Sequence, residues 1–385
     1  MNVLHLVQDE KFIDFFARAM DLVDGIRHRY IVHTPNLNQP LRHIRQVNPF
    51  RQVDDSYFSS RIMKDDLANC DVLVVHFLTP QGARMINAAP ANLKIVWSGW
   101  GADYYHLLPG GEDSLLGSET REIARKLNLR RAGTNPLLHA RLLLRPARRF
   151  YIRHARIMPA IQRVNFFSSP IPEDYVLIKN HLGNRFTASY VQLNYGSVEE
   201  TFALGSGWDR KRNILVGNSA VLTNNHVEIF RILANHNLTD RKVIVPLSYG
   251  DSDYRQIVLD YGQKILGSYF HPIIDFLPLA DYNKLISSCS CAIMNNYRQQ
   301  ALGNIGSILY GGAKLFLNAK NVTSQFFSER GAHIFNISEL MLSDEDIFSE
   351  LTSQQKKKNI QILEDFWGQE KIVENVLELI RKIGN

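Results

Sequence analysis

Residues 213–225 have the sequence NILVGNSAVLTNN, which begins as a short apolar strand and ends in small polar residues. A helical pattern follows at 225–236, so the strand, the polar turn and the helix form one β/α unit. Apolar runs at 242–247, 291–295 and 314–317 alternate with helical patterns in the same way. This alternation predicts a parallel sheet covered by helices on both faces.

The first half of the chain repeats this organisation. Apolar runs lie at 3–7, 28–33, 71–78, 94–100, 165–169 and 190–195, and a Gly-, Ser- and charge-rich stretch at 205–212 separates the two series. We therefore predict an α/β protein with two Rossmann-like domains facing a central cleft. The first domain covers 1–200 and the second covers 201–360, and a helix at 361–385 is expected to pack back toward the first domain.

Composition and motifs exclude several classes. The 385 residues are 45% hydrophobic and 21% charged, which is ordinary for a globular protein, and no apolar run is long enough for a transmembrane helix. Cys70, Cys289 and Cys291 are an odd set without zinc-site spacing, so we expect neither a disulfide scaffold nor structural zinc. Neither a G-x-G-x-x-G fingerprint after the first strand nor a P-loop occurs, which argues against dinucleotide oxidoreductases and P-loop NTPases.

The net charge of +6 is concentrated in one segment. Residues 123–172 contain no Asp or Glu but eleven Lys and Arg, among them Arg145, Arg148 and Arg149. A solvated basic helix, a helix lying on anionic lipid and a nucleic-acid surface all fit such a segment. We expect the lipid surface, because apolar residues are interleaved with the arginines and no nucleic-acid-binding motif accompanies them.

Two loops of the second half have the residue types of a phosphate and sugar site. Each follows a strand and precedes a helix, so backbone N–H groups, amides and one guanidinium would face a ligand. Well-capped β/α loops without a ligand are the alternative. The candidate nucleotide-sugar-binding residues in these loops are Gly217, Asn218, Ser219, Arg298, Gln299, Gln300, Gly303 and Asn304, and Tyr249 after the strand at 242–247 joins them.

The triplet Asp251-Ser252-Asp253 matches the D-x-D pattern with which some sugar-nucleotide enzymes hold a divalent cation. It lies directly before a predicted helix, so helix capping by Ser252 or Asp253 explains it more simply. We expect no metal site.

The loop after the strand at 94–100 is rich in aromatic residues and glycine. Trp100 and Tyr104 could stack on a sugar, and Asp103 could take a proton from an acceptor hydroxyl as a general base. A helix-capping Asp103 beside packed tryptophans is the alternative. His76, which ends another strand, is a second candidate base, although a histidine in that place is more often only hydrogen-bonded in the fold.

Four strings in this order resemble one known family. They are WGADYY at 100–105, ILVGNS at 214–219 with Asn225-His226, KVIVPLSY at 242–249 and RQQALG at 298–303. The family is the TDP-N-acetylfucosamine:lipid II N-acetylfucosaminyltransferases, glycosyltransferase family 56, and the resemblance runs from about residue 94 to 318.

The resemblance implies a GT-B glycosyltransferase with an acceptor-binding first domain and a donor-binding second domain. It implies an inverting, metal-independent transfer of a 4-acetamido-4,6-dideoxyhexose from a TDP-sugar to a polyprenyl-diphosphate-linked glycan, peripherally at the cytoplasmic face of the bacterial inner membrane. No cofactor and no nucleic acid are expected. The lack of acids at 282–328 suits a deoxyribose, which has one fewer hydroxyl to bind. A sugar-nucleotide epimerase and a non-enzymatic basic protein of membranes or nucleic acids are the alternatives.

Overall fold

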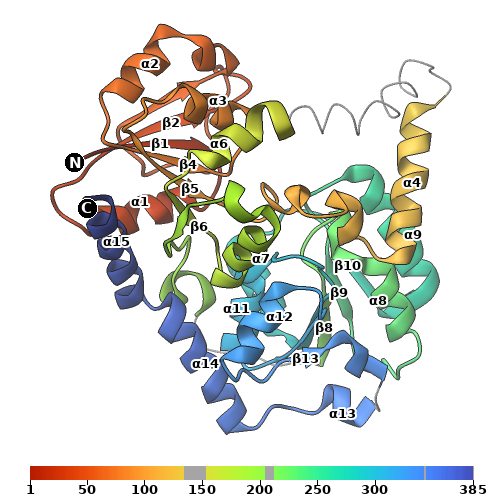
Figure 1. Cartoon of the computed structure of the whole chain (residues 1–385). Helices are drawn as coiled ribbons and strands as arrows, with labels where there is room; N and C mark the ends of the chain where they lie inside the picture. The colour runs from red at the N-terminus through yellow and green to blue at the C-terminus, as the bar shows by residue number, and fades with distance from the viewer. Residues whose placement is uncertain (134–152, 204–211, 342–343, 385) are drawn as a thin grey trace. The chain divides into compact units, whose positions relative to one another are not determined.

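The computed structural model describes residues 1–133, 153–203, 212–341 and 344–384 (Figure 1). The chain divides into two compact units. The first comprises Met1–Pro109, Leu144–Ser197 and Gln369–Asn385, and the second comprises Gly110–Leu143 and Val198–Gly368. Two helices belong to units whose main part lies elsewhere in the sequence. Helix α4 (Ser118–Ala132) packs on α8 (His226–Leu233) within the second unit, and α15 (Gln369–Gly384) packs on α1 (Ile13–Asp21) within the first.

Among the described residues, the sheet of the first unit has seven parallel strands in the order β3-β2-β1-β4-β5-β6-β7. The chain runs from β1 through α1 to β2 on one side, and β4 borders β1 on the other side. The strand order therefore reverses between β1 and β4, which is where ligands of such sheets bind. The strands are β1 (Asn2–Gln8), β2 (Arg27–His33), β3 (Phe50–Val53), β4 (Val72–His76), β5 (Lys94–Ser98), β6 (Phe166–Ser168) and β7 (Ser189–Tyr190). The other described α-helices of this unit are α2 (Arg61–Ala68), α3 (Pro80–Ala88), α6 (Met158–Gln162) and α7 (Pro172–Leu182).

The sheet of the second unit has, in its described part, six parallel strands in the order β10-β9-β8-β11-β12-β13. Its order reverses between β8 and β11. The strands are β8 (Asn213–Val216), β9 (Val243–Pro246), β10 (Phe270–Ile273), β11 (Cys289–Met294), β12 (Lys314–Leu317) and β13 (Phe335–Asn336). Besides α4 and α8, the α-helices in the described ranges of this unit are α9 (Ser252–Leu266), α10 (Leu279–Ser287), α11 (Leu302–Tyr310), α12 (Val322–Glu329), α13 (Asp344–Phe348) and α14 (Ser353–Trp367).

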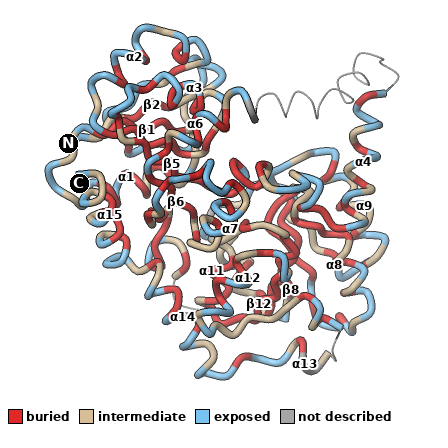
Figure 2. Tube along the Cα trace, viewed as in Figure 1, coloured by how far each residue is buried: buried red, intermediate tan, exposed pale blue. Residues whose placement is uncertain are grey.

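Both sheets lie in the interior of their units, as the buried strands in Figure 2 show. Every residue of β4 is buried, which agrees with the continuous apolar run at 72–75. No helix in the described part of the chain is long and apolar enough to cross a membrane.

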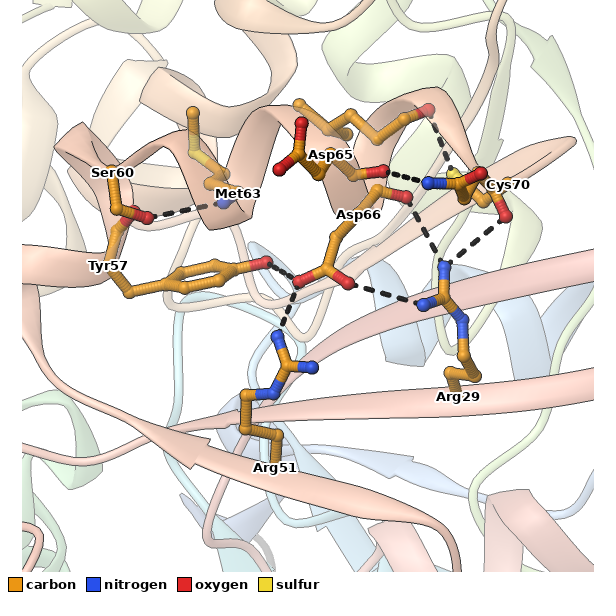
Figure 3. A network of polar contacts seen from close by, with 10 residues as sticks. Arg29, Arg51, Tyr57, Ser60, Met63, Asp65, Asp66 and Cys70 are labelled. Atoms are coloured by element: carbon orange, nitrogen blue, oxygen red, sulfur yellow. Dashed lines mark hydrogen bonds and ion pairs between the residues drawn. The ribbon is translucent and has the colours of Figure 1, made fainter.

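A buried carboxylate links the edge strand of the first sheet to its neighbours. Asp66 of α2 accepts a hydrogen bond from the Tyr57 hydroxyl at 2.9 Å and pairs with Arg51 of β3 at 2.8 Å and Arg29 of β2 at 3.2 Å (Figure 3). The three donors satisfy a carboxylate that is 8% exposed. The short strand β3 is thereby tied to both β2 and α2.

Candidate functional site

In the second unit, the carboxyl ends of β8 and β11 lead into two helices that lack a side-chain cap. Strand β8 continues through 217–225 into α8, and β11 continues through 295–301 into α11. The residue before each helix is left-handed, with φ of 51° at Asn225 and 62° at Ala301, and neither side chain caps the first turn. Both helices therefore begin at the switch point, the place where the strand order reverses between β8 and β11. The N-cap side chain accepts no hydrogen bond from the first-turn N–H groups of either helix. Such helix ends bind anions.

Three loops meet through side-chain amides at this edge. Gln300 Nε2 donates to Asn218 Oδ1 at 2.9 Å, and Asn218 Nδ2 donates to the Tyr249 hydroxyl at 2.9 Å. The Thr223 hydroxyl donates to Gln300 Oε1 at 2.6 Å. Asn218 and Gln300 are buried, whereas Tyr249 is 56% exposed. The structure thus brings three of the predicted binding residues into direct contact and leaves an aromatic ring at the surface beside them.

The other predicted residues of this group lie in the same loops or at the start of α11. Arg298 Nη1 donates to the Gln299 carbonyl at 2.9 Å, and Asn304 Nδ2 donates to the Tyr282 hydroxyl at 2.8 Å. A Cβ on Gly303 would meet nothing within 4 Å. The first turn of α11 therefore has open space beside its backbone, which is the condition for close approach of a ligand.

His226 and Asn224 shape the turn after β8, and neither was predicted from the sequence as a binding residue. Gly217 has a φ of +66°, and a Cβ there would lie 2.8 Å from His226 Nε2 and 3.0 Å from Asn224 Oδ1. His226 is fully buried, its Nδ1 lies 3.1 Å from the Tyr254 hydroxyl, and its Nε2 has no hydrogen-bond partner among the described residues. Burial lowers its pKa to about 3, so the ring is neutral. The signal for His226 in the sequence was its place directly after the helix-starting Asn225.

The predicted Ser219 also belongs to this turn. Asn224 Nδ2 donates to the Ser219 carbonyl at 2.8 Å and lies 3.1 Å from its hydroxyl. Asn224 Oδ1 accepts from the Asn218 N–H at 3.2 Å. Asn224 therefore holds the backbone of the loop in place while Asn218 takes part in the amide contacts.

The D-x-D triplet is a helix cap with an arginine partner. Asp251 is the N-cap of α9 and accepts the N–H groups of Asp253 and Tyr254, both at 3.0 Å, which corrects the expectation that Ser252 or Asp253 caps this helix. Arg131 of α4 contacts both carboxylates at 2.7 Å. No group of three or more His, Cys, Asp or Glu side chains with the arrangement of a metal site occurs in the described ranges.

In the first unit, Asp103 joins two loops at the carboxyl edge. Its Oδ2 accepts the Leu78 N–H at 2.8 Å and the Trp97 indole N–H at 2.9 Å, and its Oδ1 accepts the Trp100 N–H at 2.8 Å. The residue is 2% exposed. Burial raises the pKa of Asp103, and the three hydrogen bonds oppose this rise. The geometry favours a positioning role, and its predicted role as general base stays a prediction.

His76, the second predicted base, lies inside a buried hydrogen-bonded chain. Its Nε2 is 3.1 Å from Nδ1 of His5, and its Nδ1 is 2.6 Å from the Tyr195 hydroxyl, which donates to Ser98 Oγ at 2.6 Å. Nε2 of His5 in turn lies 2.9 Å from Nδ1 of His28. Burial lowers the pKa of His76 to about 3. The imidazole is neutral, and both of its nitrogens have partners within the fold.

The residues predicted to contact the acceptor or the membrane differ in how far they are exposed. Tyr104 is fully buried and packs on Trp97 and Phe167, so in this structure it cannot touch an acceptor, contrary to expectation. Trp100 is partly exposed and contacts Tyr195 edge-on, with ring centroids 5.1 Å apart. Arg145, Arg148 and Arg149 lie outside the described residues.

Comparison with known families gives a match within the second unit. Residues 200–364 match the family model described as 4-alpha-L-fucosyltransferase, glycosyl transferase group 56. The matched range contains the loops after β8 and β11, α8, α11 and all nine predicted nucleotide-sugar-binding residues. Over these residues, the matched family model is that of the glycosyltransferase group that the sequence resembles.

Solved structures confirm the fold over the whole chain. The α,α-trehalose-phosphate synthase (UDP-forming) of Burkholderia xenovorans, in complex with glucose-6-phosphate, has a TM-score of 0.62 at 10% identity and covers all of both chains. The sucrose-phosphate synthase of Thermosynechococcus elongatus has a TM-score of 0.62 at 10% identity, covering 100% of this chain and 99% of its own. The Anabaena protein HepE, in complex with UDP and glucose, has a TM-score of 0.62 at 11% identity, with 99% and 100% covered. The chain therefore has the GT-B fold.

Proposed function

Since the chain is a glycosyltransferase of the GT-B fold whose residues 200–364 match group 56, we propose that it uses a TDP-sugar as donor. The sugar is a 4-acetamido-4,6-dideoxyhexose such as N-acetylfucosamine, or a related deoxysugar, and the acceptor is a polyprenyl-diphosphate-linked glycan. The observation that carries the donor assignment is the pair of helices, α8 and α11, that begin without side-chain caps at one switch point. Their N–H groups and positive dipole ends suit a diphosphate.

The proposed donor site divides into a phosphate part and a nucleoside part. Arg298 and the start of α11 face the diphosphate, and the exposed ring of Tyr249 offers a stacking surface for thymine. Asn218 and Gln300 supply amide groups for the sugar hydroxyls. Residues 282–328 carry no carboxylate, which supports a deoxyribose over a ribose.

The proposed reaction is a single inverting displacement. The acceptor oxygen attacks the anomeric carbon, the bond from that carbon to the diphosphate oxygen breaks, and TDP leaves with the electron pair. Helix N-termini and a guanidinium can stabilise the negative charge that grows on the leaving diphosphate. A carboxylate can serve as the base that removes the acceptor's proton. The proposal therefore assigns no step to a metal ion.

The proposed lipid-linked acceptor and the proposed location at the membrane are inferred from the basic segment. Residues 123–172 carry eleven Lys and Arg and no acid, which supports contact with an anionic surface at the cytoplasmic face of the inner membrane. Liposome binding should fall steeply as salt rises, because attraction to lipid is screened over about 8 Å at physiological ionic strength. Reversing the charges of Arg145, Arg148 and Arg149 should abolish vesicle binding. Retained binding would contradict this part of the proposal.

Incubation of the purified protein with TDP-sugars tests the function, with and without a polyprenyl-diphosphate glycan. A transferase forms a larger glycolipid and releases TDP in equal amount. The matched UDP-sugar serves as the nucleotide control and should react more slowly. Conversion of the free TDP-sugar into an isomer without lipid would instead indicate an epimerase, and the absence of glycolipid with every TDP-sugar would refute the proposal.

A further inference from the structure

The loops at the carboxyl edge of the first sheet carry several carboxylates, and most of them have structural partners. Asp9 accepts three backbone N–H groups from residues 42–44 at 2.6 to 3.0 Å. Asp54 accepts the N–H of the residue two positions later at 2.9 Å, and Asp55 lies 3.1 Å from an imidazole nitrogen. Asp103 accepts three N–H groups and is buried. A base must have a free lone pair within reach of the substrate, so these four are poorly placed for that role.

Glu10 differs from these four. It lies two residues after the end of β1, at the point where the strand order of the first sheet reverses between β1 and β4. Its side chain is partly buried and makes no hydrogen bond or ion pair with another described residue. In open parallel α/β sheets, ligands bind at the carboxyl ends of the strands where the strand order reverses. Glu10 is therefore a carboxylate at the binding edge with its lone pairs unused by the fold.

Aromatic rings form the surroundings of this edge. Phe12, two residues after Glu10, contacts Trp100 with ring centroids 6.2 Å apart. Phe77 contacts the same indole at 5.9 Å and has a φ of +61°, a strained value for a residue with a Cβ. Strain of this kind is concentrated at functional sites, and aromatic faces suit the apolar faces of sugar rings. The Asp103 carboxylate holds the loops of both Leu78 and Trp100, so it keeps this aromatic edge in place.

We propose that Glu10 is the general base that takes the proton of the acceptor hydroxyl, and that Asp103 is a positioning residue. The assignment rests on the proposed inverting transfer. As the acceptor oxygen forms its bond to the anomeric carbon, its proton passes to Glu10, and the electron pair of the breaking bond leaves with the nucleoside diphosphate. The proton then moves from Glu10 to water. The transfer therefore needs no reactant beyond the donor, the acceptor and water.

The electrostatic surroundings suit a base. Burial raises the pKa of Glu10, and the charges of His43 and Lys11 lower it in part, while Asp9 adds to the rise. A raised pKa makes the carboxylate a stronger proton acceptor once it is ionised. The rate should therefore increase with pH as Glu10 loses its proton. Because His43 contributes to the electrostatic surroundings of Glu10, its Asn variant belongs in the experiment as a control.

The test compares Glu10→Gln with Asp55→Asn, a matched loss of one carboxylate at the same edge. Glu10→Gln should lower kcat about 10² to 10⁴-fold, the usual contribution of general base catalysis. Its Kd for TDP-sugar should stay within twofold, because the proposed donor residues belong to the second unit. Asp55→Asn should keep kcat within threefold. The acid limb of the pH–rate profile should vanish in Glu10→Gln and persist in His43→Asn.

Donor hydrolysis separates this inference from the proposed acceptor. Water can replace the acceptor hydroxyl, so the slow release of TDP from TDP-sugar alone should also fall in Glu10→Gln. If the wild-type protein hydrolyses donor but forms no glycolipid, the acceptor assignment is wrong while hydrolysis still measures the effect of Glu10. A Glu10→Gln protein that transfers or hydrolyses at the wild-type rate overturns the assignment. A circular dichroism melt checks that the variant is folded, and Glu10→Asp, which keeps a carboxylate, should recover part of the rate.

Discussion

Replacing Asp103 by Asn separates a positioning carboxylate from a catalytic one. The carboxylate accepts three N–H groups, two on Oδ2 and one on Oδ1. An amide keeps one oxygen and turns the other acceptor into a donor. At least one buried N–H group would then point at an NH₂ group. Unlike Glu10→Gln, this substitution should therefore damage the fold of the first unit.

The magnitude follows from the burial. Asp103 is 2% exposed, so water cannot replace the lost partner. A hydrogen bond to a charged group contributes about 1.5 to 3 kcal/mol, and an unsatisfied buried donor costs about 1 to 3 kcal/mol. The lost hydrogen bond and the unsatisfied donor describe partly the same change, so their costs are not simply added. We expect a loss of about 2 to 4 kcal/mol in the free energy of unfolding.

The loss should depend on pH. Burial raises the pKa of Asp103 in the folded state, so the native protein binds this proton more tightly than the unfolded chain does. The corresponding stabilisation is fully present below the unfolded pKa and is lost as the pH rises through the folded pKa. Asn does not titrate. The difference in unfolding free energy between wild type and Asp103→Asn should therefore be largest at acid pH and smaller above the folded pKa.

Urea denaturation, followed by tryptophan fluorescence, and hydrogen exchange of peptides covering 72–105 measure the effect. Asp66→Asn is the matched control, because Asp66 is another nearly buried carboxylate with three donors in the same unit (Figure 3). Its arginine partners are 38% and 52% exposed, so the screened loss should be smaller, about 1 to 2 kcal/mol, with activity retained. Wild-type stability in Asp103→Asn together with a rate 10²-fold lower would refute the positioning role and restore Asp103 as the base.

Four further outcomes are expected. Arg298→Ala should weaken TDP binding by about 1.5 to 3 kcal/mol in calorimetry, and an unchanged Kd would remove Arg298 from the site. Gly217→Ala should weaken donor binding at least tenfold, because its Cβ would lie 2.8 Å from His226 Nε2; tolerance would show that the turn can relax. The double Asn substitution of Asp251 and Asp253 should lower stability by about 1 kcal/mol through the loss of the α9 cap, while transfer persists in EDTA; a strict Mn²⁺ or Mg²⁺ requirement would contradict this. The Kd for TDP-sugar should be constant from pH 5 to 8, since the pKa of His226 is about 3, and a titration in that range would indicate another group.

The central strands were predictable from the sequence, and three of the four edge strands were not. Strands β4, β5 and β8 contain continuous apolar runs, and β1 and β11 are mostly apolar with one polar residue inside each, because both faces of these strands are covered. The three strands without such a signal, β3, β10 and β13, all lie at sheet edges. Strand β10 contains Pro272, which an edge strand tolerates, and β13 has only two residues. The run at 190–195 was predicted as one strand, but β7 ends at Tyr190, and the buried Val191 and Leu193 gave the signal by packing into the core.

The donor loops were easier to predict than the acceptor side. A strand, a small polar turn and a helix follow one another along the chain, so their order alone locates Gly217–Ser219 and Arg298–Gly303 at the carboxyl edge. The environment of Asp103 depends on Leu78, which is 25 residues away in the chain and whose N–H no pattern of residue types reveals. The sequence could show an acid in an aromatic loop, but only the fold shows that its lone pairs are already in use.

The two units also differ in which of their site residues can change charge near neutral pH. In the proposed donor loops, amides, hydroxyls and backbone N–H groups are assigned most of the binding, and the guanidinium of Arg298 is charged at all relevant pH values. Burial keeps His226 neutral. In the first unit, His76 and His5 are likewise kept neutral by burial, whereas Glu10 is a partly buried carboxylate with a raised pKa. Donor affinity and the rate of proton removal should therefore respond differently to pH. A pH dependence in kcat without one in donor Kd would thus be evidence about the acceptor edge of the first sheet alone.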